Sequence, residues 1–402
     1  AQALSLARPG LAQAIVDLAR EFDKLRGCER LLAYAMGAVN NVCMVHNSSQ
    51  DIDRSELVTL ALDVARNLQE NDHLAAIEVY GLIASIAPSI SNKGYFAQGA
   101  VDIAKGLLKS RTMELAVQLE ALRALNALVA DSAIVQRIFW AGVSVASVIE
   151  ISRLHVDSET WQGLSCTLFS NLLQESELLE SGGERRILAE LCLAMSRHSD
   201  SPEVQEVASA AVCRVSGDRE LSPLLQDGLL GQAISGMSKF HYSVQMQING
   251  CITIWNVALD GNMFNIPSIR ERCATCLTST LQNFLEQSTV VDAACSAIWA
   301  FVHKSSERKN AIAKCGGIDV LTCALVMHQN EVGILEKACA VLSSLSAEQH
   351  LVSGILEAQG LSSIIDAIRN NPDSQSLVEY GTLFLKNVEI INIVLQITNI
   401  NY

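Results

Sequence analysis

The stretch that decides the fold lies between residues 297 and 321. It reads AIWAFVH over residues 297–303 and GGIDVL over residues 316–321. The first phrase is an apolar helix that ends in a polar residue, and the second is a glycine pair that leads into an apolar run. Each phrase has counterparts elsewhere in the chain, and self-similarity at a fixed period is typical of repeat proteins.

Phrases similar to GGIDVL recur about 41 to 45 residues apart along the chain. One interval is about twice as long, and its missing phrase falls near residues 269–276, where the apolar pattern continues without a glycine. The phrases begin at Gly99, Gly142, Gly182, Gly228, Gly316 and Gly360. A period of this length lies in the range of HEAT and armadillo repeats.

The apolar phrase runs in step with the glycine phrase. Its last residue is polar in most copies, and the mean step between copies is about 43 residues. The copies end at Asn41, Ser85, Ala127, Asn171, Arg214, Asn256, His303, Ser344 and Asn387. Two separate phrases with one period indicate about nine repeats, each of which contacts only its neighbours.

The apolar residues within each repeat have helical spacing. Ala294, Ile298 and Phe301, for example, share one face of a helix. Ser201-Pro202 places a cap residue before a proline at the first helical position, which is a helix start signal. Only the run that begins at Ile390 comes near the alternation of a strand. We therefore predict an all-α fold, an α-solenoid.

The two phrases at 297–303 and 316–321 resemble the armadillo repeat. That family opens a helix with Gly-Gly-hydrophobic and closes the repeat with an apolar helix of the type Ala-Leu-Trp-Ala-Leu-Ser-Asn. The resemblance extends from about Leu31 to Asn387. It implies about nine armadillo-like three-helix repeats in a right-handed superhelix.

No linker divides the chain, because its 402 residues include only 6 prolines and no Gly/Ser-rich segment. We therefore predict that residues 1–389 form a single armadillo-repeat solenoid. Residues 390–402 are rich in β-branched residues and asparagine. They form either a terminal cap that shields the last repeat or an extended tail, and the sequence leaves both open.

Composition excludes several classes of partner. The net charge is −14, with 29 basic and 43 acidic residues, which argues against nucleic acid and favours a basic peptide. No run of about 18 apolar residues predicts membrane insertion. The 12 cysteines are scattered through apolar helices and suit buried thiols in a reducing compartment. Together with an N-terminus that lacks a secretory signal, they predict the cytoplasm, and the nucleus satisfies the same criteria.

The sequence contains no motif for catalysis or for a cofactor. Phosphate-cradling and nucleophile-elbow glycine patterns are missing, and the histidines form no HExxH cluster. Cys273 and Cys276 have the spacing of half a zinc site, but no second pair lies nearby, so we interpret them as core. We predict that the chain is not an enzyme and binds no cofactor or metal.

The armadillo resemblance also implies a binding surface. In that family the third helix of each repeat lines a concave groove, and its closing asparagine faces an extended peptide. An amide side chain can pair with both the N–H and the C=O of a peptide backbone. The corresponding residues here are predicted to bind a partner, and we refer to them as the polar ladder: Asn41, Asn171, Asn256, Trp299, His303 and Asn387.

An alternative is that the polar ladder only satisfies local backbone groups or faces water. The ladder is incomplete, because Ser85, Ala127, Arg214 and Ser344 interrupt it. Nuclear import adaptors of the family place a tryptophan four residues before each asparagine. Only Trp299 and His303 come near that arrangement, so import-signal binding is not predicted.

Three functions follow, in descending order. The first is a scaffold or adaptor that binds a protein or an extended peptide, with a basic peptide favoured, in the groove. The second is a structural subunit that acts as a strut in a large assembly. The third is the regulatory portion of a larger enzyme.

Overall fold

The computed structural model describes residues 54–68, 72–109, 114–174, 182–215, 230–258 and 262–398, together with residues 17, 35–38 and 228. Every regular element among them is a helix, which confirms the predicted all-α fold. The chain divides into two compact units, unit 1 (Ala1–Ala211) and unit 2 (Val212–Tyr402), with the boundary inside α11. We describe each unit by itself, and the single solenoid over residues 1–389 stays a prediction.

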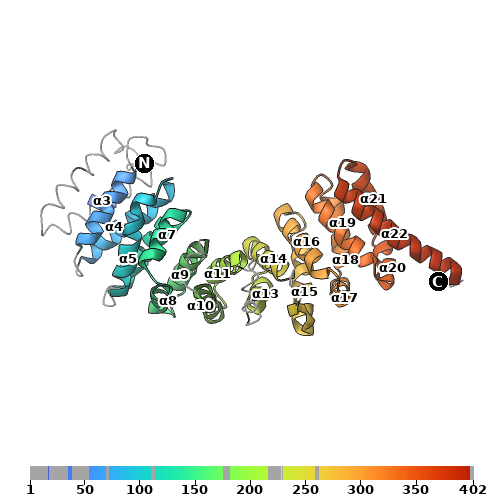
Figure 1. The fold of residues 1–402 in the computed structure, drawn as a ribbon, viewed down its shortest axis with the longest axis horizontal. Coiled ribbons are helices and arrows are strands. Elements are labelled where there is room, and N and C mark those ends of the chain that lie inside the picture. Colours follow the sequence, from blue (N-terminus) through green and yellow to red (C-terminus); the bar gives the residue numbers. More distant parts are fainter. Residues whose placement is uncertain are drawn as a thin grey trace. The chain divides into compact units, whose positions relative to one another are not determined.

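Unit 1 consists of short helices joined by tight connections (Figure 1). Its α-helices are α3 (Arg54–Asn67), α4 (His73–Ile86), α5 (Ala97–Lys109), α6 (Leu115–Val129), α7 (Ala133–Gly142), α8 (Val145–Ser152), α9 (Glu159–Leu172), α10 (Gly183–Arg197) and α11 (Pro202–Val215). Its 3-10 helices are η2 (Ala87–Ser89), η3 (Gly94–Phe96) and η4 (Arg153–His155). α4, α6 and α9 pack side by side in one layer, and α5, α8 and α10 pack in a second.

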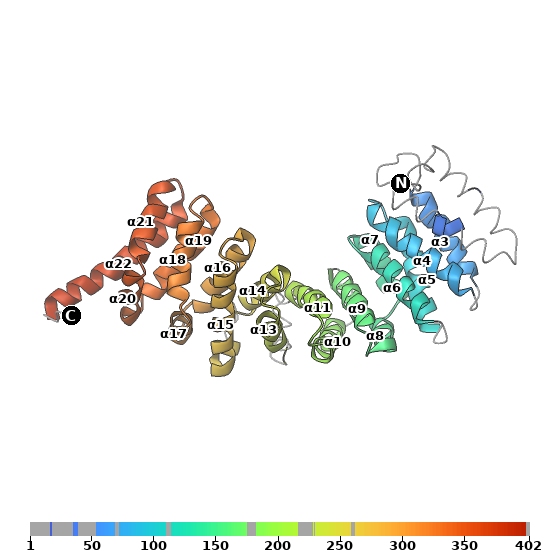
Figure 2. The same cartoon turned by 180° about the vertical axis from the view of Figure 1, so that it is seen from behind.

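Unit 2 has the same two layers, which Figure 2 shows from behind. Its helices are α13 (Leu230–Lys239), α14 (Val244–Ala258), η8 (Asn262–Asn265), α15 (Pro267–Asn283), α16 (Ser288–Val302), α17 (Ser306–Lys314), α18 (Gly317–Met327), α19 (Val332–Ser346), α20 (Gln349–Glu357), α21 (Gly360–Asn370) and α22 (Gln375–Thr398). α14, α16, α19 and α22 form one layer, and α13, α15, α18 and α21 form the other.

The repeat is visible in the helix that closes each unit of the pattern, the third helix. Successive third helices begin about 43 residues apart. They are α4, α6, α9, α11, α14, α16, α19 and α22. The first helix is a full α-helix in α7, α17 and α20, whereas the 3-10 helices η3 and η8 take its place before α5 and α15. The three-helix repeat is thus complete in some copies and shortened in others.

The glycine phrase marks the junction between first and second helices. Gly316 follows α17 in the left-handed conformation, with φ of 81°, which glycine adopts at little cost. Gly317 then begins α18 so close to α17 that a Cβ atom there would lie 2.8 Å from the backbone oxygen of Ile312. The Gly-Gly pair therefore allows the chain to turn sharply and the two helices to pack closely.

A buried glutamine holds the fourth position of three third helices, as Gln162 in α9, Gln205 in α11 and Gln247 in α14. In each case its Nε2 donates to two backbone carbonyls at the end of the preceding second helix. In α14 these are the carbonyls of Met237, at 2.9 Å, and Phe240, at 3.2 Å. The glutamine thus satisfies carbonyls that a helix end leaves without partners.

The C-terminal segment is helical. α22 runs through the predicted boundary at residues 389–390 and ends at Thr398. Its side chains up to Val388 pack on α19 and α21, with Leu377 and Phe384 fully buried. The role of residues 390–402 as a cap stays a prediction.

Candidate functional site

The third helices of unit 2 expose two tryptophans. Trp255 of α14 and Trp299 of α16 are each 38% exposed, while the isoleucine before each of them is fully buried. Each tryptophan is the twelfth residue of its helix, so the two hold equivalent positions in consecutive repeats. Because α14 and α16 pack side by side, these equivalent positions lie on one face of the layer.

The two tryptophans line a hollow of about 190 Å³ that extends across four consecutive third helices, which we call the tryptophan groove. Its other lining residues are small or amphipathic side chains from α16, α19 and α22. They are Ser296, Glu336, Lys337, Ala340, Ser376 and Tyr380. The aromatic rings come from three helices, so the groove offers apolar walls with a few polar groups, as ligand sites commonly do.

Ion pairs and hydrogen bonds fix the polar groups of the groove. Lys337 of α19 donates from Nζ to Oδ1 of Asp292 on α16, at 2.5 Å. Glu336 accepts a hydrogen bond at Oε1 from the hydroxyl of Ser374, at 2.7 Å. The positive charge of Lys337 is therefore paired, whereas the carboxylate of Glu336 contacts no cation among the described residues. The groove carries one net negative charge beside its aromatic faces.

The polar ladder splits into two registers. Asn171, Asn256 and Asn387 are each the thirteenth residue of a third helix and are half-buried. In α16 the thirteenth residue is the buried Ala300, whereas His303 is exposed and lies just after the helix. Aligning the repeats by their closing polar residue therefore joined positions that are one helical turn apart.

The structure uses one ladder residue inside the fold. Asn387 donates from Nδ2 to the Ser343 carbonyl at 3.3 Å and to the Ser346 hydroxyl at 3.0 Å, both on the preceding third helix. Asn171 lies in unit 1, away from the tryptophan groove, and Asn41 lies outside the described residues. Partner binding by these asparagines stays a prediction.

Two other ladder residues lie at or beside the groove. Trp299 lines it, and the ring of His303 lies 6.4 Å from the Trp299 ring, centroid to centroid. Asn256 directly follows Trp255. Sequence reasoning missed Trp255, Glu336, Lys337 and Tyr380. A signal for Trp255 was present, because the dipeptide Ile-Trp at 254–255 recurs at 298–299.

The Cys273–Cys276 pair lies within α15 and both side chains are buried. Burial raises the pKa of both thiols, which keeps them protonated at neutral pH. The hydroxyl of Ser238 lies 3.1 Å from the Cys276 sulfur. In the part of the chain that the structure describes, no three His, Cys, Asp or Glu side chains are placed to hold a metal ion.

Among the described helices, none alone has the length and apolar character to cross a membrane. Three bent helix pairs pass the same test by length and composition.

Comparison with known proteins extends these observations. Residues 193–380 match the family model described as "Protein zer-1 homolog-like, C-terminal domain", which includes the tryptophan groove up to Tyr380. The match spans just under half of the chain and is a similarity. A search of curated proteins finds no match to this sequence.

Two solved structures resemble the chain closely in fold. One is a crystal structure of an engineered protein, with TM-score 0.69 and 15% identity, covering 95% of this chain and 92% of the other. The second comes from work on a phosphorylation switch that controls the interaction between cadherin and beta-catenin. Its TM-score is 0.68 at 14% identity, and 92% of this chain and 68% of the other are covered. These likenesses confirm the predicted fold class, an armadillo-type α-solenoid.

Proposed function

We propose that this chain is a non-catalytic protein-interaction scaffold that binds an extended peptide segment of a partner in the tryptophan groove of unit 2. The observation that supports the proposal best is the pair of half-exposed tryptophans at equivalent positions of α14 and α16. Large aromatic side chains that are left partly open cost free energy in water, and they are enriched where proteins bind partners.

The dimensions of the groove suit a peptide better than a small metabolite. It is open, holds about 190 Å³ and continues over four parallel third helices. An extended chain rises about 3.3 Å per residue, so neighbouring helices about 10 Å apart would each contact every third residue. Small residues at Ser296, Ala340 and Ser376 keep the floor between the aromatic rings low.

The charges of the groove favour a peptide with a basic side chain. The Glu336 carboxylate has no cationic partner among the described residues, and the Trp299 face lies on the same surface. A lysine or arginine could place its aliphatic stem on an indole ring and its charge beside Glu336. The excess of acidic residues in the chain acts in the same direction at longer range.

Selection of random linear peptides on the full chain, followed by calorimetric titration of the selected peptides, tests the proposal. Trp255→Ala and Trp299→Ala are each expected to weaken binding roughly 30-fold, because removing a tryptophan anchor costs about 2 kcal/mol or more. The matched control is Tyr242→Ala, an aromatic residue of unit 2 that is 62% exposed and does not line the groove. It is expected to leave affinity unchanged.

Glu336→Gln gives a second, charge-specific readout. It is expected to weaken peptides that contain lysine or arginine and to leave uncharged peptides unaffected. If the double tryptophan variant folds normally and binds every selected peptide as the parent does, the groove is not the binding site. A stoichiometric native complex that persists in that variant would instead support the strut function, with contacts elsewhere on the solenoid.

We also propose a reducing compartment, the cytoplasm or the nucleus, for this chain. The cysteines of the described residues are all free, and most of them are buried in helix packing. Buried free thiols are typical of proteins that fold in reducing conditions. Microscopy of the tagged protein in its native source tests this, and secretion into the medium would contradict it.

A further inference from the structure

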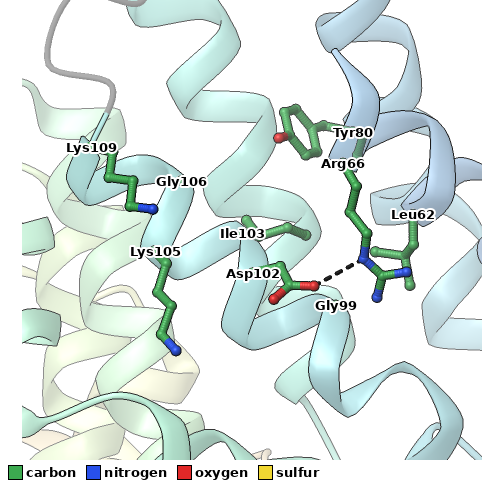
Figure 3. A pocket seen from close by; sticks show the side chains of 10 residues that line it. Leu62, Arg66, Tyr80, Gly99, Asp102, Ile103, Lys105, Gly106 and Lys109 are labelled. Carbon is green, nitrogen blue, oxygen red and sulfur yellow. Dashed lines mark hydrogen bonds and ion pairs between the residues drawn. The ribbon is translucent and has the colours of Figure 1, made fainter. Parts of the chain in front are cut away.

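A second hollow, of about 320 Å³, lies on unit 1 and is separate from the tryptophan groove. Its walls are the consecutive second helices α3 and α5, and α4 supplies Tyr80 (Figure 3). α3 and α5 approach closely at one end, where a Cβ atom on Gly99 would lie 2.6 Å from the Leu62 side chain. The polar groups that line it are Arg66, Tyr80, Asp102, Lys105 and Lys109.

The carboxylate in this hollow already has partners. Asp102 accepts from Nε of Arg66 at 3.0 Å and from Nε2 of Gln98 at 2.9 Å. The ion pair holds the Arg66 guanidinium against α5, as the dashed line in Figure 3 shows. Arg66 is thereby fixed in place with part of its fork still facing the hollow. A fixed guanidinium loses less freedom when it binds a further group.

The lysines of the hollow, by contrast, have no partner. Lys105 and Lys109 lie one turn apart on α5, are exposed, and make no ion pair with any residue that the structure describes. With Arg66 they supply three positive charges, against two negative charges from Asp63 and Asp102. The hollow is therefore locally positive in a chain whose net charge is −14.

Tyr80 adds a neutral donor to these cations. Its phenol is largely buried, burial raises its pKa, and so the hydroxyl keeps its proton near neutral pH. The hydroxyl makes no hydrogen bond to a described residue, although buried polar groups nearly always have partners. In Figure 3 it points into the space between α4 and α5.

A glycine keeps the hollow open. Gly106 lies inside α5 on the same face as Asp102 and Lys109, and glycine in a helix interior is destabilising relative to alanine. No close packing requires it, because a Cβ atom there would meet no heavy atom within 4 Å. The space beside Gly106 is available to a ligand rather than filled by the protein.

We propose that this hollow binds a phosphate monoester, with Lys105, Lys109 and Arg66 as its cationic ligands and Tyr80 as a hydroxyl donor. A phosphate monoester carries about −1.5 to −2 charges at pH 7 and three strong acceptor oxygens, which match donors that converge from three helices. A carboxylate is planar, singly charged, and leaves one of these directions without an acceptor. The hollow is also a single compact site, whereas an acidic chain would need an extended basic stripe.

Fluorescence polarisation of a labelled peptide, Gly-Ala-phosphoserine-Ala-Gly, on the full chain tests the proposal. The phosphorylated peptide is expected to bind at least about tenfold more tightly than its unphosphorylated form, since charge-assisted hydrogen bonds contribute that much or more. Lys105→Gln combined with Lys109→Gln is expected to remove this difference. The matched control combines Lys304→Gln with Lys314→Gln, which are exposed lysines of unit 2.

Gly106→Leu provides a steric test that leaves every charge in place. Because the position is open, the variant is expected to fold with an unchanged or higher melting temperature and to lose the phosphopeptide. Competition with inorganic phosphate identifies the source of the group. Equal potency of free phosphate indicates a small phosphate ester, and at least tenfold tighter phosphopeptide binding indicates a phosphorylated protein.

The proposal is overturned if phosphorylation does not change peptide affinity. It is equally overturned if the Lys105 and Lys109 variant behaves like the control, or if folded Gly106→Leu binds as the parent does. Trp255→Ala and Trp299→Ala should not affect this site, so the result is independent of the tryptophan groove.

Discussion

Replacing Gln247 with alanine is expected to destabilise unit 2 locally, around α13 and α14. Gln247 is 2% exposed and its amide makes three hydrogen bonds. Nε2 donates to the carbonyls of Met237 and Phe240, and Oε1 accepts from the hydroxyl of Thr280 at 2.5 Å. One side chain thus connects the end of a second helix to the third helix and to the next second helix, α15.

The magnitude follows from what each group loses. The Phe240 carbonyl keeps a bond from the Ser243 N–H, at 3.0 Å, so its loss is small. The Met237 carbonyl and the Thr280 hydroxyl lose their partners in a buried site, which costs about 1–3 kcal/mol for each such group. Since the site can relax in part, we expect a total of about 2–4 kcal/mol.

Hydrogen exchange measured by mass spectrometry on the full chain is the suitable assay, because stacked repeats open locally. A loss of this size accelerates exchange in α13 and α14 by roughly 30-fold to 900-fold. The control is Gln245→Ala, an exposed neighbour whose loss is expected to cost about 0.5 kcal/mol or less. Equal exchange in the two variants would refute the idea that Gln247 holds the helix end.

Three further predictions test other features of the fold. Gly317→Ala should destabilise the α17–α18 junction by about 1–3 kcal/mol, because its Cβ meets backbone, whereas Gly333→Ala has room and should be neutral or stabilising in thermal melts. Hydrogen bonds from Ser and Lys side chains lower the pKa of Glu348, so its stabilising effect is present above the ordinary carboxyl pKa and is lost as pH falls through the lowered value. Glu348→Gln should therefore flatten the acid side of the stability profile, and an unchanged profile would contradict this. Burial raises the pKa of Cys295 to about 12, so iodoacetamide at pH 7.5 should label exposed Cys323 first, and mass spectrometry of equal labelling would contradict the packing.

The polar ladder shows where sequence reasoning reached its limit. The closing polar residue of a repeat was taken as a fixed position, but His303 lies after α16, whereas Asn256 lies within α14. Helix ends vary by about a turn from repeat to repeat, since they depend on local capping. Alignment by the buried apolar residues would have paired Trp255 with Trp299, because burial fixes a helical face more strictly than a helix end does.

The sequence by itself determined the helical class, the period of about 43 residues and the glycine-marked junctions. These depend on interactions within a few turns of one chain segment: apolar spacing, capping and the conformational freedom of glycine at Gly316. The tertiary structure alone decided that Trp255, Trp299, Glu336 and Tyr380 share one groove. Their side chains come from four separate helices, and only the stacking of those helices determines which exposed faces meet.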